Sequence, residues 1–270
     1  MASGILAEMT IDQVRAFRPE VVVLGVASTE PHGPVLPYGT DYFQCDAVVR
    51  EGVTQANAAG AGALMYPTLP IGNNVNFKAF PFACRIGVQT LMQVVLDVIA
   101  ALEEDAVRKI VLFSGHGGNT DALRAALRAH AQSKGPHPKG AFVCLTSYPP
   151  EHFRKSDLVE HPSDHGGERE VSMMMHLQGE LVHKDSLGVH KWGELAVKSL
   201  AQEGVYFVKP WHLHVPDSAG GDVRKASASK GRQLVQEAGS RLAKLLVELS
   251  AAKWTESFPF KSGPKRGKGK

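Results

Sequence analysis

The chain has 270 residues, 43% of them hydrophobic, and carries a formal net charge of +3 at pH 7. This length and composition are typical of an ordinary globular protein with a sizeable core, and no apolar run approaches the ~18 residues that span a bilayer, so we expect no membrane segment. Five of the 30 lysines and arginines lie in residues 261–270, which leaves 25 basic against 27 acidic residues elsewhere and excludes a strongly basic, nucleic-acid-binding body.

Short apolar runs alternate with helical patterns along the chain. Strands are predicted, in chain order, over residues 20–28, 63–70, 109–115 and 140–148. Helices are predicted over residues 42–59, 90–105, 119–132, 168–179 and 226–249, and Asn119 is expected to cap the third of these. The first run, EVVVLGVAS, is continuous and β-branched, as in a strand buried on both faces. This alternation favours an α/β fold with a mostly parallel sheet and helices on both faces.

Neither the N-terminus nor the cysteines indicate export. The segment MASGILAEMTIDQ lacks the charged start and apolar core of a signal peptide. The cysteines, Cys45, Cys84 and Cys144, are odd in number and far apart, which is typical of free thiols in a reducing compartment. We therefore expect a cytoplasmic protein with a single domain over residues 1–260 and a basic, disordered tail over 261–270.

Acidic residues and histidines cluster in the segment STEPHGPVLPYGTD, residues 28–41. Glu30 and His32 directly follow the first predicted strand, and His116, in the segment SGHGGNTD, follows the third. Open parallel sheets bind ligands beyond the carboxyl ends of their strands, so we expect these side chains to meet at one edge. The glycines around His116 do not form a phosphate loop, because the chain has neither GxxxxGKS nor GxxxxGKT and Thr120 occupies the last glycine position of GxGxxG.

A third segment of this kind, SDHGGEREVSMMMHL, spans residues 163–177. Here His165, Glu168 and Glu170 follow a turn and enter a predicted helix. Two residues of advance along a helix turn about 200°, so only one of the two glutamates can face the site. The sequence does not choose between them.

Together these side chains make a cluster of carboxylates and imidazoles. It consists of Glu30, His32, Asp41, His116 and either Glu168 or Glu170. Mixed nitrogen and oxygen ligands suit Zn²⁺, Mn²⁺ or Fe²⁺. Three carboxylates and two histidines suffice for two ions that share one carboxylate, and paired ions can activate a water and polarise a carbonyl oxygen. The cluster therefore indicates a metal-dependent hydrolase.

Taken singly, each of these residues has a simpler interpretation. His116 could be an ordinary polar loop residue, and Glu30 with His32 could form a surface pair. Asp41 could cap a helix that begins at Tyr42. The occurrence of three such segments, each at the end of a strand and rich in Gly or Pro, favours a site.

The segments STEPHGPVLPYGTD, FSGHGGN and HGGEREVS resemble those of the creatininase (creatinine amidohydrolase) family. They occur in the family's order and spacing across residues 20–175, and the combination of Glu-x-His-Gly with Leu-Pro-x-Gly-Thr-Asp is highly specific. The resemblance implies a three-layer α/β/α sandwich with a mostly parallel sheet, a binuclear metal site, and a hexamer assembled as a trimer of dimers.

The resemblance also implies metal-binding roles. Glu30 and His32 would ligate different ions. Asp41 would bridge the two ions, and His116 would bind the first. Glu170 matches the glutamate of the family's ETS segment, which reads EVS here, and Glu170, or else Glu168, would complete the shell of the second ion.

Two catalytic roles and one departure follow from the same resemblance. His165 occupies the position of a histidine proposed as general acid/base. Whichever of Glu168 and Glu170 does not bind metal, with Glu168 as our prediction, is expected to orient the attacking water or His165. Creatininase proper has a metal-binding carboxylate two residues after its glycine-flanked histidine, whereas this chain has Gly118. That departure weakens the case for creatinine itself as the substrate.

A second departure concerns the loop GNNVNFKAFPFA, residues 72–83. Many relatives have Glu and His where this chain has Val75 and Asn76. Because this loop is expected to border the substrate, we expect the substrate to have changed. The side chains expected to contact it are Asn74, Asn76, Trp192 and Trp211, although the tryptophans could equally fill a subunit interface.

We therefore expect a binuclear metal-dependent hydrolase that opens a small cyclic amide, or cleaves a related C–N amide bond, through a metal-bridging hydroxide. Its cofactors would be two divalent ions, Zn²⁺ or Mn²⁺, with Fe²⁺ as a further candidate. It would act on a small molecule, as a homo-oligomer, with neither nucleic acid nor membrane as partner. Two alternatives stay open: a hydrolase that opens a cyclic polyol ketone by breaking a C–C bond, and a non-catalytic family member that binds a small ligand.

Overall fold

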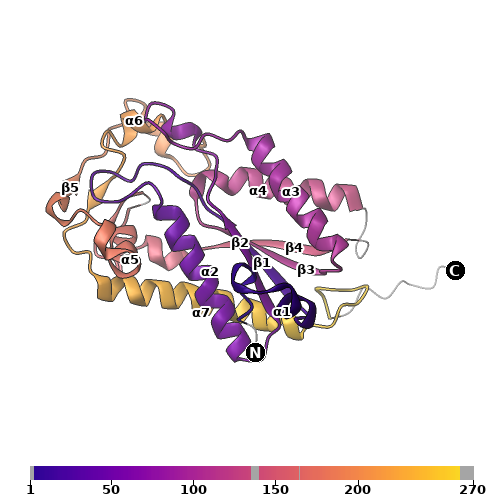
Figure 1. The fold of residues 1–270 in the computed structure, drawn as a ribbon. Helices are drawn as coiled ribbons and strands as arrows, with labels where there is room; N and C mark the ends of the chain where they lie inside the picture. Colours follow the sequence, from indigo (N-terminus) through magenta and orange to yellow (C-terminus); the bar gives the residue numbers. More distant parts are fainter. Residues whose placement is uncertain (1–2, 135–139, 164, 262–270) are drawn as a thin grey trace.

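The structure, a computed structural model, describes residues 3–134, 140–163 and 165–261. At its centre lies a sheet of four parallel strands in the order β2–β1–β3–β4 (Figure 1). The four predicted strands are confirmed, and each lies inside its predicted range. They are β1 (Val21–Val26), β2 (Ala63–Leu69), β3 (Lys109–Ser114) and β4 (Phe142–Ser147).

Helices cover both faces of this sheet and give the expected three-layer α/β/α sandwich (Figure 1). On one face lie α2 (Thr40–Ala58) and α7 (Ala228–Ala251), and α5 (Glu168–Leu177) packs against both. On the other face lie α3 (Val88–Glu104) and α4 (Thr120–Lys134). The remaining elements include α1 (Ile11–Ala16), α6 (Trp211–His214) and an antiparallel pair, β5 (Val189–His190) with β6 (Gly221–Asp222).

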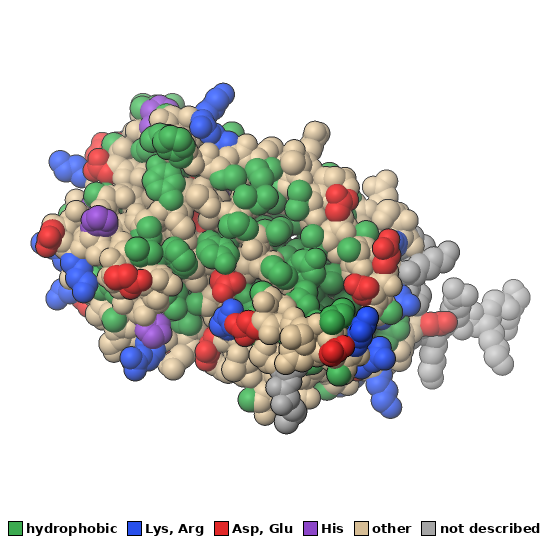
Figure 2. All heavy atoms as spheres, in the orientation of Figure 1, with side chains coloured by type: hydrophobic (Ala, Val, Ile, Leu, Met, Phe, Trp, Pro, Cys, Tyr) green, Lys and Arg blue, Asp and Glu red, His purple; other side chains and the backbone are tan. Residues whose placement is uncertain are grey.

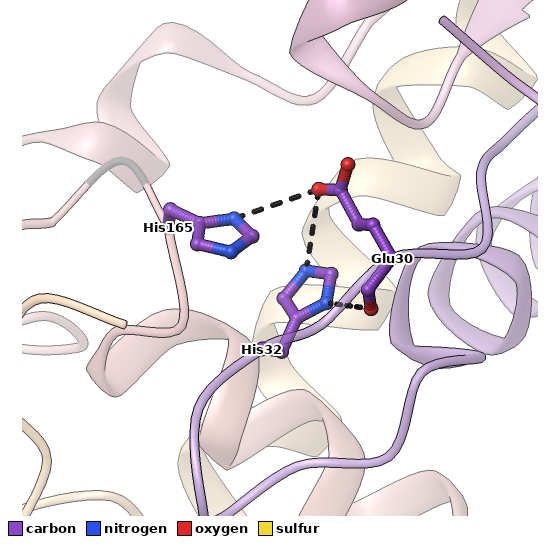
Figure 3. Close-up of side chains that lie close together, drawn as sticks. All are labelled: Glu30, His32 and His165. Atoms are coloured by element: carbon purple, nitrogen blue, oxygen red, sulfur yellow. Dashed lines mark hydrogen bonds and ion pairs between the residues drawn. The ribbon is translucent and has the colours of Figure 1, made fainter. Parts of the chain in front are cut away.

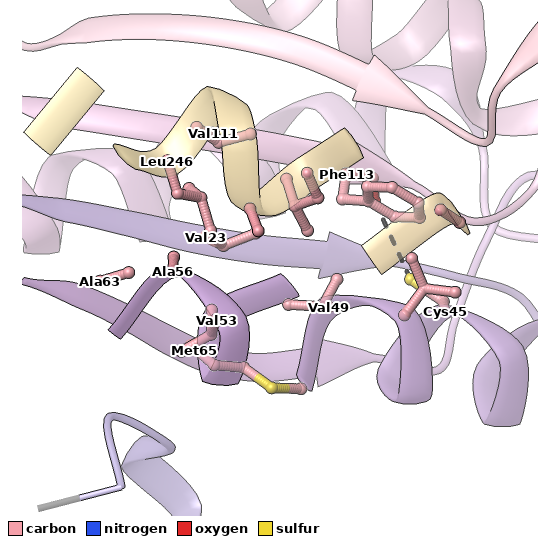
Figure 4. Close-up of a cluster of buried hydrophobic side chains, with 14 of the residues drawn as sticks. Val23, Cys45, Val49, Val53, Ala56, Ala63, Met65, Val111, Phe113 and Leu246 are labelled. Carbon is pink, nitrogen blue, oxygen red and sulfur yellow. Dashed lines mark hydrogen bonds between the residues drawn. The ribbon is translucent and has the colours of Figure 1, made fainter. Parts of the chain in front are cut away.

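The alternation of side chains along β1 explains why helices are needed on both faces. Val21 and Val23 belong to a core cluster with α2 and α7. Val22 and Leu24 belong to a second cluster, with α3 and α4. All four are fully buried, as a continuous apolar run predicts. Figure 4 shows Val23 in the first cluster with Leu246 of α7.

The strand order determines where the loops that carry the candidate ligands lie. From β1 the chain passes through α2 to β2, and then through α3 to β3 on the opposite side of β1. The order therefore reverses between β1 and β3, and ligands of open parallel sheets bind in the crevice at such a point. Glu30 and His32 follow β1, and His116 follows β3.

The helix cap expected at Asn119, and the one considered for Asp41, are both wrong. α2 begins at Thr40, so Asp41 lies inside its first turn. The Asn119 side chain accepts a hydrogen bond from the backbone N–H of Asn73 (2.9 Å) and donates to two carbonyls at the end of β1. The local sequence would assign both side chains to helix ends, but Asn119 bonds to distant segments and α2 starts one residue before Asp41.

Among the described residues, no helix is both long enough and apolar enough to cross a membrane. The tail predicted over residues 261–270 lies outside the described residues from position 262 onward. Its disorder stays a prediction, as does the single domain over 1–260.

Candidate metal centre

The five predicted metal ligands come together beyond the carboxyl ends of β1 and β3. Glu30 and His32 are 1% and 0% exposed, so they are not the surface pair that the sequence also allowed. Three overlapping sets of side chains have ligand atoms within 4.8 Å of one another. The residues in these sets are Glu30, His32, Asp41, His116, His165 and Glu170.

Asp41 belongs to two of these sets. Its Oδ2 is 3.0 Å from His116 Nδ1, and its Oδ1 is 3.3 Å from His32 Nε2. Glu30 Oε1 lies 3.2 Å from His116 Nδ1, and Glu170 Oε2 lies 3.8 Å from His32 Nε2. We name Glu30, Asp41 and His116 the first group, and His32, Asp41 and Glu170 the second group.

Each histidine at the centre has one ring nitrogen against a backbone carbonyl. The contacts are 3.1 Å for His32 Nδ1, 3.2 Å for His116 Nε2 and 2.9 Å for His165 Nε2. Because a carbonyl only accepts, these nitrogens carry the protons, and the other nitrogen of each ring faces the carboxylates. Figure 3 shows the Glu30 carboxylate facing the rings of His32 and His165, with the second nitrogen of His32 against the backbone carbonyl of Glu30. Proteins fix the tautomer of metal-binding histidines by such contacts.

The chemistry of these residues fits divalent cations. Within the described chain, Glu30 Oε2 and His32 Nε2 are buried and have no hydrogen-bond partner. In the same part of the chain, Glu30 and Asp41 form ion pairs with histidines alone, so no fixed cation neutralises them. Carboxylate and imidazole ligands of this kind suit Zn²⁺ and Mn²⁺.

In the metal-free protein, protons neutralise these carboxylates. Burial opposes a charge on His32, but neighbouring carboxylates, Asp41 first, outweigh it and raise the pKa of His32 to about 9. Burial also opposes a charge on His116, yet Glu30 and Asp41 raise its pKa well above the usual value. Burial would raise the pKa of Asp41, but the two histidines lower it, whereas burial does raise the pKa of Glu30.

Metal binding is therefore expected to release protons. At pH 7 the metal-free protein carries a proton on His32 and on His116, and metal ligands must be deprotonated, so filling both groups should release about two protons per chain. Protonated His32 stabilises the metal-free fold fully below the usual histidine pKa of 6.5, and this stabilisation is lost as the pH rises towards 9. A metal ion must displace the same proton from His32, so the affinity for metal should increase as the pH rises towards 9. Calorimetric titration with Zn²⁺ in buffers of different ionisation enthalpy measures the release. Binding at pH 7 without proton release would contradict the assignment.

His165 joins the cluster through Glu30. Its Nδ1 lies 3.6 Å from Glu30 Oε1, and the side chain is buried. Burial, and then the positive charge of His32, lower the pKa of His165 to about 4. The imidazole is therefore neutral at pH 7, and its Nδ1 can accept a proton. The other rings packed on it are Phe77 and Trp211, with centroids 4.9 and 4.8 Å away.

Glu168 has a structural position, which corrects the catalytic role expected for it. The side chain is fully buried, and its Oε1 accepts a hydrogen bond from Lys230 Nζ at 2.6 Å. Its Oε2 accepts from the backbone N–H groups of Glu160 and His161, at 2.9 and 2.8 Å. Both oxygens are thus used to hold a loop and α7, and it is Glu170 that the structure brings to the cluster.

Replacing Glu168 with glutamine should therefore destabilise the fold without removing metal. Breaking a buried ion pair costs about 3 kcal/mol, because it leaves the partner's charge uncompensated. Urea denaturation and metal analysis measure the two effects. Glu160→Gln, which removes the partly exposed partner of the same lysine, is the matched control and should change stability much less. Loss of bound metal at unchanged stability would contradict this role.

Of the four residues expected to contact substrate, two line a cavity. This cavity has a volume of about 910 Å³ and is bordered by Asn76, Trp211 and residues of the segment 193–214. Trp211 stacks on Phe77 at 5.0 Å and touches the ring of His165. The cavity wall is therefore continuous with the candidate metal centre.

The other two residues lie elsewhere. Asn74 is buried, and its Nδ2 donates to Ser28 Oγ at 2.6 Å, which braces the loop after β1. Trp192 packs on His214, with ring centroids 5.0 Å apart, and fits closely over Gly220. Neither of them is among the residues that border the cavity.

Gly118 has a structural explanation. A Cβ atom at this position would lie 2.4 Å from His116 Nε2 and 2.4 Å from the carbonyl oxygen of Asn73. Any side chain would break the contact that fixes the tautomer of His116. The carboxylate of creatininase proper therefore has no room here, and the second group contains Glu170 instead.

Two residues at the centre could not be anticipated from the sequence. Phe77 is buried and packs between the cluster and the cavity wall. Arg169 is also buried, and its Nη2 donates to Glu170 Oε1 at 2.7 Å. A phenylalanine in a loop and an arginine between two glutamates have no distinctive signal in a single sequence.

Comparisons with known proteins extend over most of the chain. The model of the creatininase family (creatinine amidohydrolase) matches residues 7–246. The chain is 29% identical over 242 residues to a mycofactocin precursor peptide peptidase of Mycobacterium ulcerans, with 87% of each protein covered. It is 23% identical over 271 residues to a 3-dehydro-scyllo-inosose hydrolase of Thermotoga maritima, with 93% of this chain and 83% of the relative covered.

Solved structures share the fold. A protein of Bacteroides fragilis described as a creatinine amidohydrolase is 27% identical, with a TM-score of 0.82 and coverage of 95% of this chain and 100% of that one. A creatininase mutant of Zn–Zn type and a Mn creatininase give TM-scores of 0.69 and 0.67, each covering 93% of this chain and 100% of theirs. At 23% and 22% identity, these two indicate the fold alone.

Proposed function

The chain belongs to the creatininase family and is a hydrolase that acts on amide bonds; from this premise we propose that it is a binuclear metal-dependent amidohydrolase. The observation that carries the proposal is the position of Asp41, whose two oxygens face His116 and His32 at 3.0 and 3.3 Å. A carboxylate so placed can bridge the paired cations of a hydrolytic site. We propose Zn²⁺ or Mn²⁺, with Fe²⁺ as a further candidate, because all three suit this donor set.

The first group would hold one ion and the second group the other. When bound, the two ions would supply an activated water and a polarised substrate carbonyl. His165 accepts a proton at Nδ1 and delivers it to the leaving nitrogen. The carbonyl of Pro31, 2.9 Å from Nε2, keeps that nitrogen protonated and so directs Nδ1 towards the cluster.

The substrate would lie between the cluster and the cavity. Phe77 and Trp211 form an apolar wall beside His165 and restrict the access of water to the proton-transfer site. A volume of about 910 Å³ is in the range that holds drug-sized ligands, so a ring or a short peptide-like chain would fit. We propose a small cyclic amide or a related C–N amide, including the amide of a peptide, on which the M. ulcerans relative is named to act.

The test is a hydrolysis screen with protein loaded with Zn²⁺ or Mn²⁺. The panel contains lactams, formamides, short peptides and cyclic polyol ketones, and mass spectrometry identifies the products. We expect an amide to be cleaved, the activity to disappear on chelation, and the same metal to restore it. Amide turnover that is unaffected by chelation would contradict a metal-dependent mechanism.

A second candidate function is the opening of a cyclic polyol ketone at a C–C bond. It is favoured by the likeness to the T. maritima hydrolase and by the polar side chains of Asn76, Gln202 and Tyr206 around the cavity. The same metal ligands would serve, and His165 would deliver the proton to the leaving carbon instead of a leaving nitrogen. Opening of a ketone with no cleavage of any amide would favour this candidate. Retention of all five ligand side chains argues against a non-catalytic binding role.

We further propose a cytoplasmic homo-oligomer, a hexamer built as a trimer of dimers. The segment 189–213 exposes apolar side chains that a partner copy could cover, among them Val189, Val197 and Leu213. On the face drawn in Figure 2, hydrophobic side chains gather over the middle, and charges of both signs are interspersed around them. That distribution supports a protein partner rather than nucleic acid. Light scattering should give the mass of six chains, and a monomer would contradict the proposal.

A further inference from the structure

Arg169 is a buried cation beside the second group. Its side chain is 4% exposed, and its guanidinium lies 4.8 and 4.7 Å from the ring centroids of Tyr148 and Phe153. Nη2 donates to Glu170 Oε1 at 2.7 Å, and Nη1 donates to Gln44 Oε1 at 3.4 Å. Nη1 also donates to Met173 Sδ at 3.5 Å, so two ring faces and three acceptors hold the planar guanidinium in one position.

This contact limits what Glu170 can offer a cation. Its Oε1 is occupied by Arg169, while its Oε2 accepts from the backbone N–H of Gly166 at 2.6 Å and faces His32 Nε2 at 3.8 Å. Glu170 therefore presents one oxygen to an ion. A carboxylate that is already paired with a guanidinium also has less negative charge to share. The charge that the second group offers is reduced accordingly.

The first group has no such neighbour. Among the described residues, Glu30 and Asp41 form ion pairs with histidines only. Glu30 Oε2 is buried and has no hydrogen-bond partner there. Since Asp41 is common to both groups, the two groups differ in Glu30, which is paired with no guanidinium, and Glu170, which is paired with one.

We propose that Arg169 makes the two groups unequal, so that the second group binds its ion more weakly and exchanges it more readily than the first group. This inference rests on the proposed binuclear function. Arg169 is a positioning residue, because it acts through Glu170 and not on the substrate. The protein then has one resident ion and one whose occupancy follows the free metal concentration.

The test is metal affinity, measured by competition with a chelating dye. Arg169→Gln retains an amide N–H for Glu170 but removes the charge, and it should bind the weaker ion at least about tenfold more tightly, because a unit charge in a buried site repels a nearby cation strongly. Arg169→Lys retains the positive charge but loses the planar group stacked between the two rings, so its weaker affinity should lie between those of wild type and Arg169→Gln. The tighter affinity should not change in either variant.

Lys230→Gln is the matched control. It removes another cation paired with a buried glutamate of α5, Glu168, and should leave both affinities unchanged. If Arg169→Gln does not fold, two further variants answer the question with Arg169 in place. Glu170→Gln should lose the weaker ion and retain the tighter one, and Glu30→Gln should lose the tighter one.

The outcomes separate this inference from the function on which it rests. Two ions bound by wild type with equal affinity would overturn the inference and leave the proposed function standing. The same holds for an Arg169→Gln variant that binds the weaker ion no more tightly than wild type. Wild-type protein that takes up no ion would contradict the proposed function, and the inference with it.

Discussion

Asp41→Asn is expected to give a folded protein that holds no more than one ion and turns over substrate at least about 10³-fold more slowly than wild type. Asp41 belongs to both groups, with one oxygen towards His116 and the other towards His32. Asparagine has nearly the same size but only one oxygen and no charge, so it cannot bridge two cations. The loss of several kcal/mol of charge stabilisation corresponds to three or more factors of ten in rate.

Asp46→Asn is the matched control for this substitution. Asp46 lies on the same helix, where its Oδ1 accepts a hydrogen bond from Thr68 at 2.9 Å and its Oδ2 lies 3.8 Å from Arg50. The same chemical change there should leave two ions bound and the rate nearly unchanged. Metal analysis and steady-state kinetics compare the two variants. An Asp41→Asn protein with two ions and more than about a tenth of the wild-type rate would contradict the bridging role.

His165→Asn is expected to retain both ions but to lower kcat by about 10²–10⁴-fold, the usual contribution of a positioned acid or base. The Nδ1 of His165 faces Glu30 at 3.6 Å, and the carbonyl of Pro31 fixes the opposite nitrogen. An asparagine amide fills part of the same space but does not take up and return a proton. The expected signature is therefore a fall in kcat at constant metal content.

Metal content also separates this role from ligation, since His165 has a ligand atom close to those of Glu30 and His32. His161→Asn is the control, because His161 is only partly buried and its Nε2 lies 3.9 Å from Asp222 Oδ2, outside the cluster. It should leave kcat and both ions unchanged. Loss of an ion from His165→Asn would make this histidine a ligand and would overturn its role in proton transfer.

The layers of the fold could be predicted because each layer has a local signature. The continuous run Val21–Val26 is buried on both faces and predicts a central strand with helices on either side. The rule for the carboxyl ends of parallel strands then brings Glu30, His32 and His116 to one edge. The strand order could not be predicted, because it depends on which side of β1 the later strands add.

The part of the site that could not be predicted depends on contacts between distant segments. Local sequence offers Asp41 as a helix cap, and only the convergence of His32 and His116 reveals its position between them. Glu168 and Glu170 are equivalent in sequence until Lys230, on α7, is seen to engage the first of them. These assignments depend on contacts in three dimensions, whereas the types of ligand follow from the sequence motifs alone.

The most direct test of a binuclear centre is the metal content of protein purified without chelator or added metal, measured by inductively coupled plasma mass spectrometry. We predict at least one ion per chain as purified and two after reconstitution with Zn²⁺ or Mn²⁺, with one ion removed by mild chelation before the other. No ion as purified, and no uptake of Zn²⁺, Mn²⁺ or Fe²⁺ on reconstitution, would contradict the metal centre and the hydrolytic mechanism built on it.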